Sequence, residues 1–250
     1  MEQNMFIRIL NSEMELATGC TEPGAVALTA AEAGQALRKA GVDKAEEITV
    51  NASINIIKNA MSAGIPGTDY EGMDYAAAIG ALGGDPVYLL EVMNHVPRET
   101  VEAAAALVKA GKVKVNVAQV PQKLYIEVIA KGGGHTGRAI VRDLHTNVVL
   151  VEQDGTVTLD KQDADTAASG DSDVVTPEQI ASFLTVRSIW DYCTKELDPM
   201  HDPIDIIRSA VQVNSVISDE GLSKEYGLAI GRNLDPVSYT HLRAHETVLD

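Results

Sequence analysis

The segment Gly19-Cys20-Thr21-Glu22-Pro23 holds the residues of this chain best suited to chemistry. Proline is favoured in the first turn of a helix, so we expect a helix to begin near Pro23, with Cys20 just before it. At that position the helix dipole and the free backbone N–H groups stabilise a thiolate, which can act as a base or a nucleophile. The alternative is a small buried cysteine in a tight turn, and the segment alone leaves both interpretations open.

Three polar side chains, Asn55, Lys58 and Asn59, form a second cluster in an otherwise apolar stretch. One ammonium and two amides can together bind a carboxylate. The segment Ile65-Pro66-Gly67-Thr68 follows within a few residues, and its composition predicts a turn whose backbone N–H groups could reach the same anion. The alternative is the solvated end of a helix or strand.

Two histidines stand next to motif-like residues. Gly132-Gly133-Gly134 precedes His135 and resembles a phosphate loop, but the Lys-Ser/Thr ending of such loops is missing. We therefore interpret it as a hairpin turn between two strands. His145-Thr146-Asn147 is predicted to open a strand, and an isolated histidine there is most often structural.

Motifs for metal binding and for serine nucleophiles are missing from the sequence. It contains no C-x-x-C, H-E-x-x-H or EF-hand pattern and no G-x-S-x-G elbow. His241 and His245 are four residues apart and could share one helix face. They fall in a terminal segment that we expect to be non-native, as argued below.

Composition limits the function classes. The 250 residues are 45% hydrophobic and 22% charged, which is typical of a globular protein with one large or two small domains. The net charge of −16 argues against binding to nucleic acid or to an anionic membrane surface. With two cysteines, no long apolar run and no visible targeting segment, we expect a cytoplasmic protein.

The order of predicted elements indicates an α+β fold in which helices flank a mostly antiparallel sheet. Apolar periodicity predicts helices at 6–16, 24–39, 75–82, 99–110, 176–189 and 204–217. Alternation predicts strands at 47–54, 113–117, 123–130, 139–143, 146–152 and 156–159. Asp154-Gly155 is a strong hairpin signal, so we expect the middle strands to form an antiparallel meander. We expect the acidic segment 160–173 to be an exposed loop.

Five blocks occur in an order that resembles the L-cysteine desulfidase family, which is related to the α subunit of iron–sulfur L-serine dehydratase. The resemblance runs from about Leu10 to Leu234. The blocks are Gly19–Pro23, Asn55–Asn59 with Ile65–Thr68, Gly80–Gly84, His145–Asn147, and Gly221–Ser223 with Gly227-Leu228. The histidine of the family falls on His145 and not on His135.

The resemblance implies β-elimination of L-cysteine to sulfide, ammonia and pyruvate without pyridoxal phosphate. Members hold a 4Fe–4S cluster through three cysteines, and its open iron binds the leaving group. The proposed base for the substrate α-proton falls on Cys20. The substrate-binding positions fall on Thr21, Glu22, Asn55, Lys58, Asn59, His145 and Asn147. L-serine as substrate, a non-catalytic subunit that needs a separate cluster-bearing chain, and a homo-oligomer all stay open.

One departure from the family concerns the cluster. Its cysteine ligands lie in the C-terminal half of the family, whereas this chain has only Cys20 and Cys193, and Cys193 matches no ligand motif. We therefore expect no metal ligands in this chain. Its residues 1–235 resemble the N-terminal portion of the family, so we expect a fold that is truncated relative to the family. We also expect an exposed apolar surface where the other half would dock. Segment 236–250 resembles translated sequencing adapter, so we expect a non-native tail.

Overall fold

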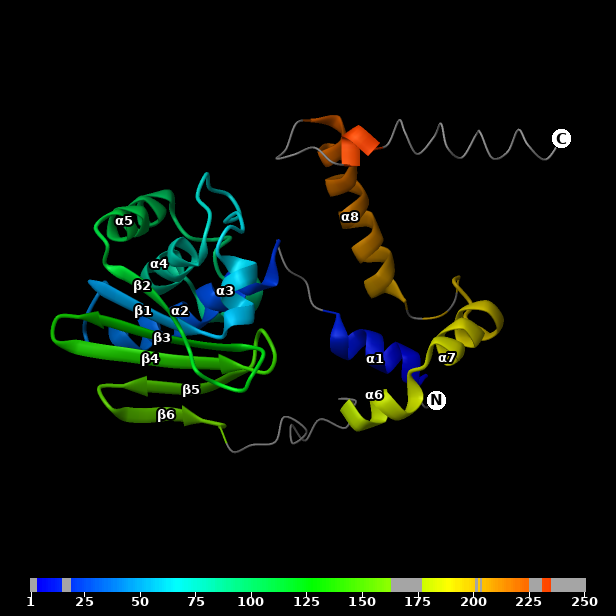
Figure 1. Cartoon of the computed structure of the whole chain (residues 1–250), viewed down its shortest axis with the longest axis horizontal. Helices are drawn as coiled ribbons and strands as arrows, with labels where there is room; N and C mark the ends of the chain where they lie inside the picture. The colour runs from blue at the N-terminus through cyan, green and yellow to red at the C-terminus, as the bar shows by residue number, and fades with distance from the viewer. Residues whose placement is uncertain are drawn as a thin grey trace. The chain divides into compact units, whose positions relative to one another are not determined.

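The computed structural model of the chain describes residues 4–14, 19–162, 177–200, 202, 204–224 and 231–234. It divides into two compact units, one formed by Glu15–Ala168 and the other by Met1–Met14 with Ser169–Asp250 (Figure 1). We call them the sheet unit and the helical unit. Segments 163–173 and 236–250 and the pair Gly227-Leu228, for which expectations are given above, lie outside the described residues.

The sheet unit confirms the predicted α+β class. Its helices are α2 (Thr21–Lys39), α3 (Ile54–Ala60), α4 (Met73–Gly83), the short 3-10 helix η1 (Pro86–Glu91) and α5 (Arg98–Lys109). Its strands are β1 (Glu47–Ala52), β2 (Val113–Val117), β3 (Tyr125–Gly132), β4 (His135–Arg142), β5 (Val148–Gln153) and β6 (Thr156–Asp160). Figure 1 shows the helices alongside one six-stranded sheet.

The strand order is β2-β1-β3-β4-β5-β6, and every pairing except that of β1 with β2 is antiparallel. The meander is therefore confirmed for β3 to β6 but was wrong for β2, because β1 lies between β2 and β3. The hairpin interpretation of the glycine run is confirmed. Gly132 pairs with His135, and Gly133 and Gly134 both have positive φ, which glycine adopts without strain.

The core forms where the alanine-rich helix α2 packs against both the sheet and α4. This packing depends on glycines at points where backbones meet. A Cβ on Gly80 of α4 would lie 2.2 Å from the carbonyl oxygen of Ala27, and one on Gly137 of β4 would lie 2.0 Å from that of Ala33. The Gly80–Gly84 block of the sequence therefore serves close helix packing.

Two local predictions need correction. The predicted strand 47–54 ends at Ala52, because Ser53 becomes the N-cap of α3 and donates its hydroxyl hydrogen to the carbonyl oxygen of Lys123 at 2.7 Å. His145 does not open a strand but lies in the turn between β4 and β5. The side chain of Asn147 closes this turn by donating to the carbonyl oxygen of Arg142 at 3.0 Å.

The helical unit contains α1 (Met5–Glu13), α6 (Pro177–Phe183), α7 (Val186–Asp191), the π-helical turn η2 (Tyr192–Glu196) and α8 (Asp205–Ser223). The single helix predicted at 176–189 was wrong, because Thr185 caps the start of α7 and separates it from α6. An aromatic cluster joins its two chain segments, since the ring of Phe6 stacks on Tyr192 at 4.3 Å and contacts Phe183 at 4.7 Å. Within the described ranges, no helix has both the length and the apolar character needed to cross a bilayer.

Candidate functional site

Cys20 is the N-cap residue of α2, which begins two residues earlier than Pro23. Its side chain is exposed and makes no capping hydrogen bond. The alternative of a buried structural cysteine is therefore wrong, and the thiol lies at the positive end of a 19-residue helix as the sequence predicted.

The side chains that follow Cys20 form a polar network with two distant segments. The Oε1 of Glu22 accepts a hydrogen bond from the Asn59 side chain of α3 at 2.8 Å. The Thr21 hydroxyl lies 3.3 Å from Nε2 of His145, in the β4–β5 turn, and 3.4 Å from Oε2 of Glu22. We call Thr21, Glu22, Asn59 and His145 the Glu22 cluster.

The carboxyl group of Glu22 is held in its ionised form. Partial burial by itself would raise its pKa. The hydrogen bond from Asn59, the backbone N–H at Glu22 and the charge of His145 outweigh burial, so the pKa lies below the ordinary 4.5. An anionic carboxylate therefore stands beside the Cys20 end of α2 at neutral pH, where it favours a cationic partner.

Asn55 and Lys58 are not part of this network. Both are exposed, and their spacing from Asn59 places all three on one side of α3. Asn55 instead lines a cavity of about 610 Å³ together with the segment 117–123. The Asn59 amide is already donated to Glu22, so the described structure does not assemble the three-donor carboxylate clamp that the sequence predicted. The Asn147 side chain is likewise engaged elsewhere, because it donates to the carbonyl oxygen of Arg142 within the β4–β5 turn.

The turn predicted at Ile65–Thr68 is confirmed and lies against the Cys20 segment. The Thr68 N–H donates to the carbonyl oxygen of Ile65 at 3.2 Å, and Gly67 has a φ of +73°, as a type II turn requires. A Cβ on Gly19 would lie 3.9 Å from Cγ of Pro66. A third sequence block therefore meets the start of α2.

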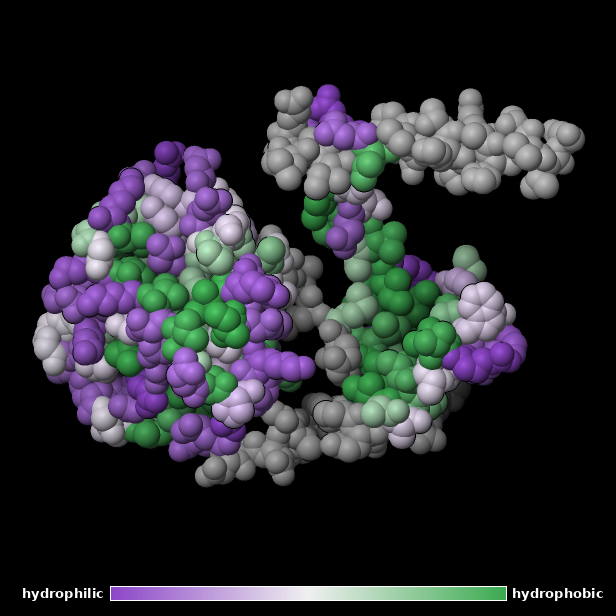
Figure 2. All heavy atoms as spheres, viewed as in Figure 1, coloured by the Kyte–Doolittle hydropathy of each residue, from purple (hydrophilic) through white to green (hydrophobic). Residues whose placement is uncertain are grey.

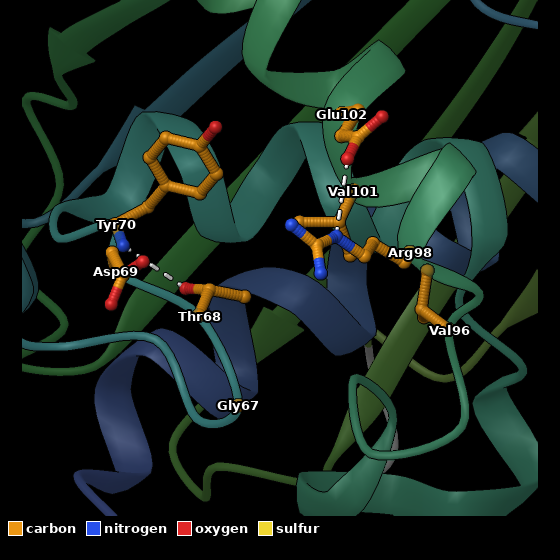
Figure 3. A pocket seen from close by; sticks show the side chains of 8 residues that line it. All are labelled: Gly67, Thr68, Asp69, Tyr70, Val96, Arg98, Val101 and Glu102. Carbon is orange, nitrogen blue, oxygen red and sulfur yellow. Dashed lines mark hydrogen bonds and ion pairs between the residues drawn. The ribbon is translucent and has the colours of Figure 1, made fainter.

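A cavity of about 510 Å³ opens next to this turn, between the segment Gly67–Tyr70 and α5 (Figure 3). Its one lining cation is already paired, since Arg98 contacts Glu102 at 3.2 Å, and the remaining charged group is the carboxylate of Asp69. Thr68 accepts from the backbone N–H of Tyr70 at 3.1 Å. We therefore assign no substrate group to this cavity.

The described residues do not fit an iron–sulfur cluster. They contain no group of three or more histidine, cysteine or acidic side chains arranged for a metal. Cys20 and Cys193 are both free and belong to different units. A 4Fe–4S cluster normally requires several thiolates, so its ligands would have to come from other polypeptide.

Sequence reasoning named the members of the Glu22 cluster but missed their mutual contacts. Glu22 and Asn59 are separated by 37 residues, and Thr21 and His145 by 124. No periodicity or local motif signals such long-range pairs. His135, by contrast, pairs with Asp154 at 2.7 Å in the hairpin region, in keeping with its exclusion from the candidate site.

Comparison with known proteins places this chain near a group of bacterial proteins that share the name "UPF0597 protein". The relative from Oleidesulfovibrio alaskensis is 38% identical over 245 residues, which cover 98% of this chain and 54% of that protein. The relative from Chromobacterium violaceum is 39% identical, over 92% of this chain and 50% of that protein. The relative from Bacteroides thetaiotaomicron is 33% identical, over 93% of this chain and 51% of that protein.

The chain therefore spans about half the length of the curated relatives it matches. Their shared name states no activity. Because the first match covers 98% of this chain, it includes part of segment 236–250, and the expectation of a non-native tail stays a prediction. No protein-family model matches the chain. No solved structure matches it either.

Proposed function

We propose that this chain forms one wall of the active site of a lyase that eliminates sulfide from L-cysteine. The observation that carries the proposal is the convergence of separated sequence blocks at the exposed Cys20. The Glu22 cluster brings α3 and the β4–β5 turn to this point, and the Pro66 turn meets the preceding residue. These are the blocks on which the resemblance to L-cysteine desulfidases depends.

The charges around Cys20 suit a zwitterionic amino acid. The backbone N–H of Thr21 at the start of α2 can bind the substrate α-carboxylate, because the helix dipole favours an anion there. The ionised carboxylate of Glu22 can pair with the substrate ammonium group. A neutral substrate without these two charges would lose both interactions, so we expect α-amino acids to be preferred.

The reaction begins with removal of the α-proton by the Cys20 thiolate, which becomes a thiol. The electron pair of the broken C–H bond forms the Cα–Cβ double bond and expels the side-chain sulfur as hydrosulfide. The resulting aminoacrylate takes up water and yields pyruvate and ammonia. The described residues contain no group of three or more side chains that could hold a cluster, so any assistance from iron to the leaving group would require ligands from protein outside them.

The proposal is tested in a chimera that joins residues 1–235 to the part of the Oleidesulfovibrio alaskensis relative that lies outside the match. Sulfide release from L-cysteine and pyruvate formation from L-serine are measured in parallel, which separates the two substrates. Cys20→Ser should lower turnover by a factor of about 10² or more, which is the usual contribution of a positioned base to the rate. Cys193→Ser, the other exposed free cysteine, is the matched control and should leave turnover nearly unchanged. Near-normal turnover in Cys20→Ser would remove the thiol from the reaction.

A further inference from the structure

Within the described part of the helical unit, helix α8 leaves most of its large apolar side chains exposed. It spans 19 residues, Asp205–Ser223, and none of them is buried. Val216 is 66% exposed and Ile217 is 64% exposed. Figure 2 shows hydrophobic side chains gathered along this helix. The exposed large apolar residues of α8 are Val211, Val213, Val216, Ile217 and Leu222.

The apolar residues form one face of α8, interrupted at its borders by polar side chains such as Ser209 and Asn214. Ile206, Ala210, Val213 and Ile217 follow one another at spacings of four, three and four residues, which places them on one stripe of an α-helix. Ile207, Val211 and Val216 widen the apolar surface on both sides of this stripe. The opposite, narrow side carries Arg208, Gln212, Ser215 and Asp219. An amphipathic helix of this kind normally buries its apolar face against another element.

Further exposed apolar side chains occur on the same unit. Val186 and Trp190 of α7 are 87% and 64% exposed, and Met200 is 80% exposed. Isolated exposed apolar residues are ordinary on protein surfaces, but an exposed apolar helix face, with other exposed apolar side chains on the same unit, indicates an interaction surface. The described part of the helical unit leaves this surface exposed.

We propose that the apolar surface of α8 binds the polypeptide that forms the unmatched half of the longer relatives. Between 46% and 50% of the length of the first two relatives has no counterpart in this chain, so a segment of suitable size exists in each of them. A second copy of this chain is disfavoured as occupant, because two chains of net charge −16 repel each other. The inference is independent of the reaction proposed above.

The test compares hydrogen exchange of α8 in residues 1–235 alone and in the chimera defined above. We expect the α8 amides to exchange at least about tenfold more slowly in the chimera, because a covered helix opens less often. Ile217→Asp places a charge on the apolar stripe and should abolish the added protection. Ser215→Asp places the same charge on the narrow polar side of the helix and should leave the protection intact.

A melting experiment supplies the second measurement. Ile217→Asp should lower the melting temperature of the chimera by about 5 °C or more and leave that of residues 1–235 unchanged. Equal α8 exchange in the two proteins would overturn the proposal. So would light scattering that shows residues 1–235 alone to be a dimer that Ile217→Asp dissociates, because the occupant would then be a second copy. Neither measurement depends on turnover, so the proposed binding to α8 can be disproved while the proposed lyase activity stands.

Discussion

The side-chain nitrogen of Asn59 donates to Oε1 of Glu22 at 2.8 Å, and this contact joins the start of α2 to α3. It keeps a carboxylate ionised beside an exposed thiol at a helix N-terminus. In the proposed lyase, this carboxylate is the partner of the substrate ammonium group.

Asn59→Ala should raise the pKa of Glu22, because the largest contribution that lowers it is lost. A carboxyl group with a lowered folded pKa adds stability above its unfolded pKa and loses it as the pH falls through the folded value. The variant should therefore be less stable than the parent at pH 7, by no more than about 1 kcal/mol because the bond is partly exposed. The difference should vanish in acid.

Titration of Glu22 by NMR and urea unfolding between pH 3 and about pH 7 measure these two effects. Asn55→Ala is the matched control, because Asn55 lies exposed on the same helix and is absent from the Glu22 cluster. A stability difference that persists unchanged at the lowest pH would show that the contact does not act through the charge of Glu22.

Gly80→Ala should destabilise the sheet unit by about 1–3 kcal/mol, the usual cost of adding a methyl group to a packed interior. The new Cβ would lie 2.2 Å from the Ala27 carbonyl oxygen, so α4 and α2 must separate. Urea unfolding measures the change. Gly64→Ala is the control, since Gly64 has open space around its Cβ position and should be close to neutral. Equal stability of the two variants would mean that the helices can separate at no cost.

The 250-residue chain alone should stay colourless after anaerobic reconstitution with iron and sulfide, and should release no sulfide from L-cysteine. The physical reason is the shortage of thiolates, since the chain has only Cys20 and Cys193. Absorption spectra, iron determination and a sulfide assay check this expectation. A stable brown protein with about four irons per chain would show that other ligands suffice.

Features that depend on neighbouring residues were predictable from the sequence. Asp154-Gly155 has positive φ at both residues and connects β5 to β6 as expected, because two-residue hairpin turns demand that conformation. The position of Cys20 before α2 also follows from local chemistry, since a proline in the first turn favours a helix start. The antiparallel run from β3 to β6 could also be predicted from the sequence, because short turns connect its strands.

Only the tertiary structure decided which of these pieces meet. The insertion of β1 between β2 and β3 joins strands that are far apart in the chain, and no turn signal records such a pairing. The contact of Thr21 with His145 depends on how α2 packs across the sheet, which the glycines at positions 80 and 137 permit. Alternation and capping act over a few residues, whereas these contacts arise from the packing of the whole sheet unit. The sequence therefore identified the residues of the Glu22 cluster, but only the tertiary structure showed how they contact one another.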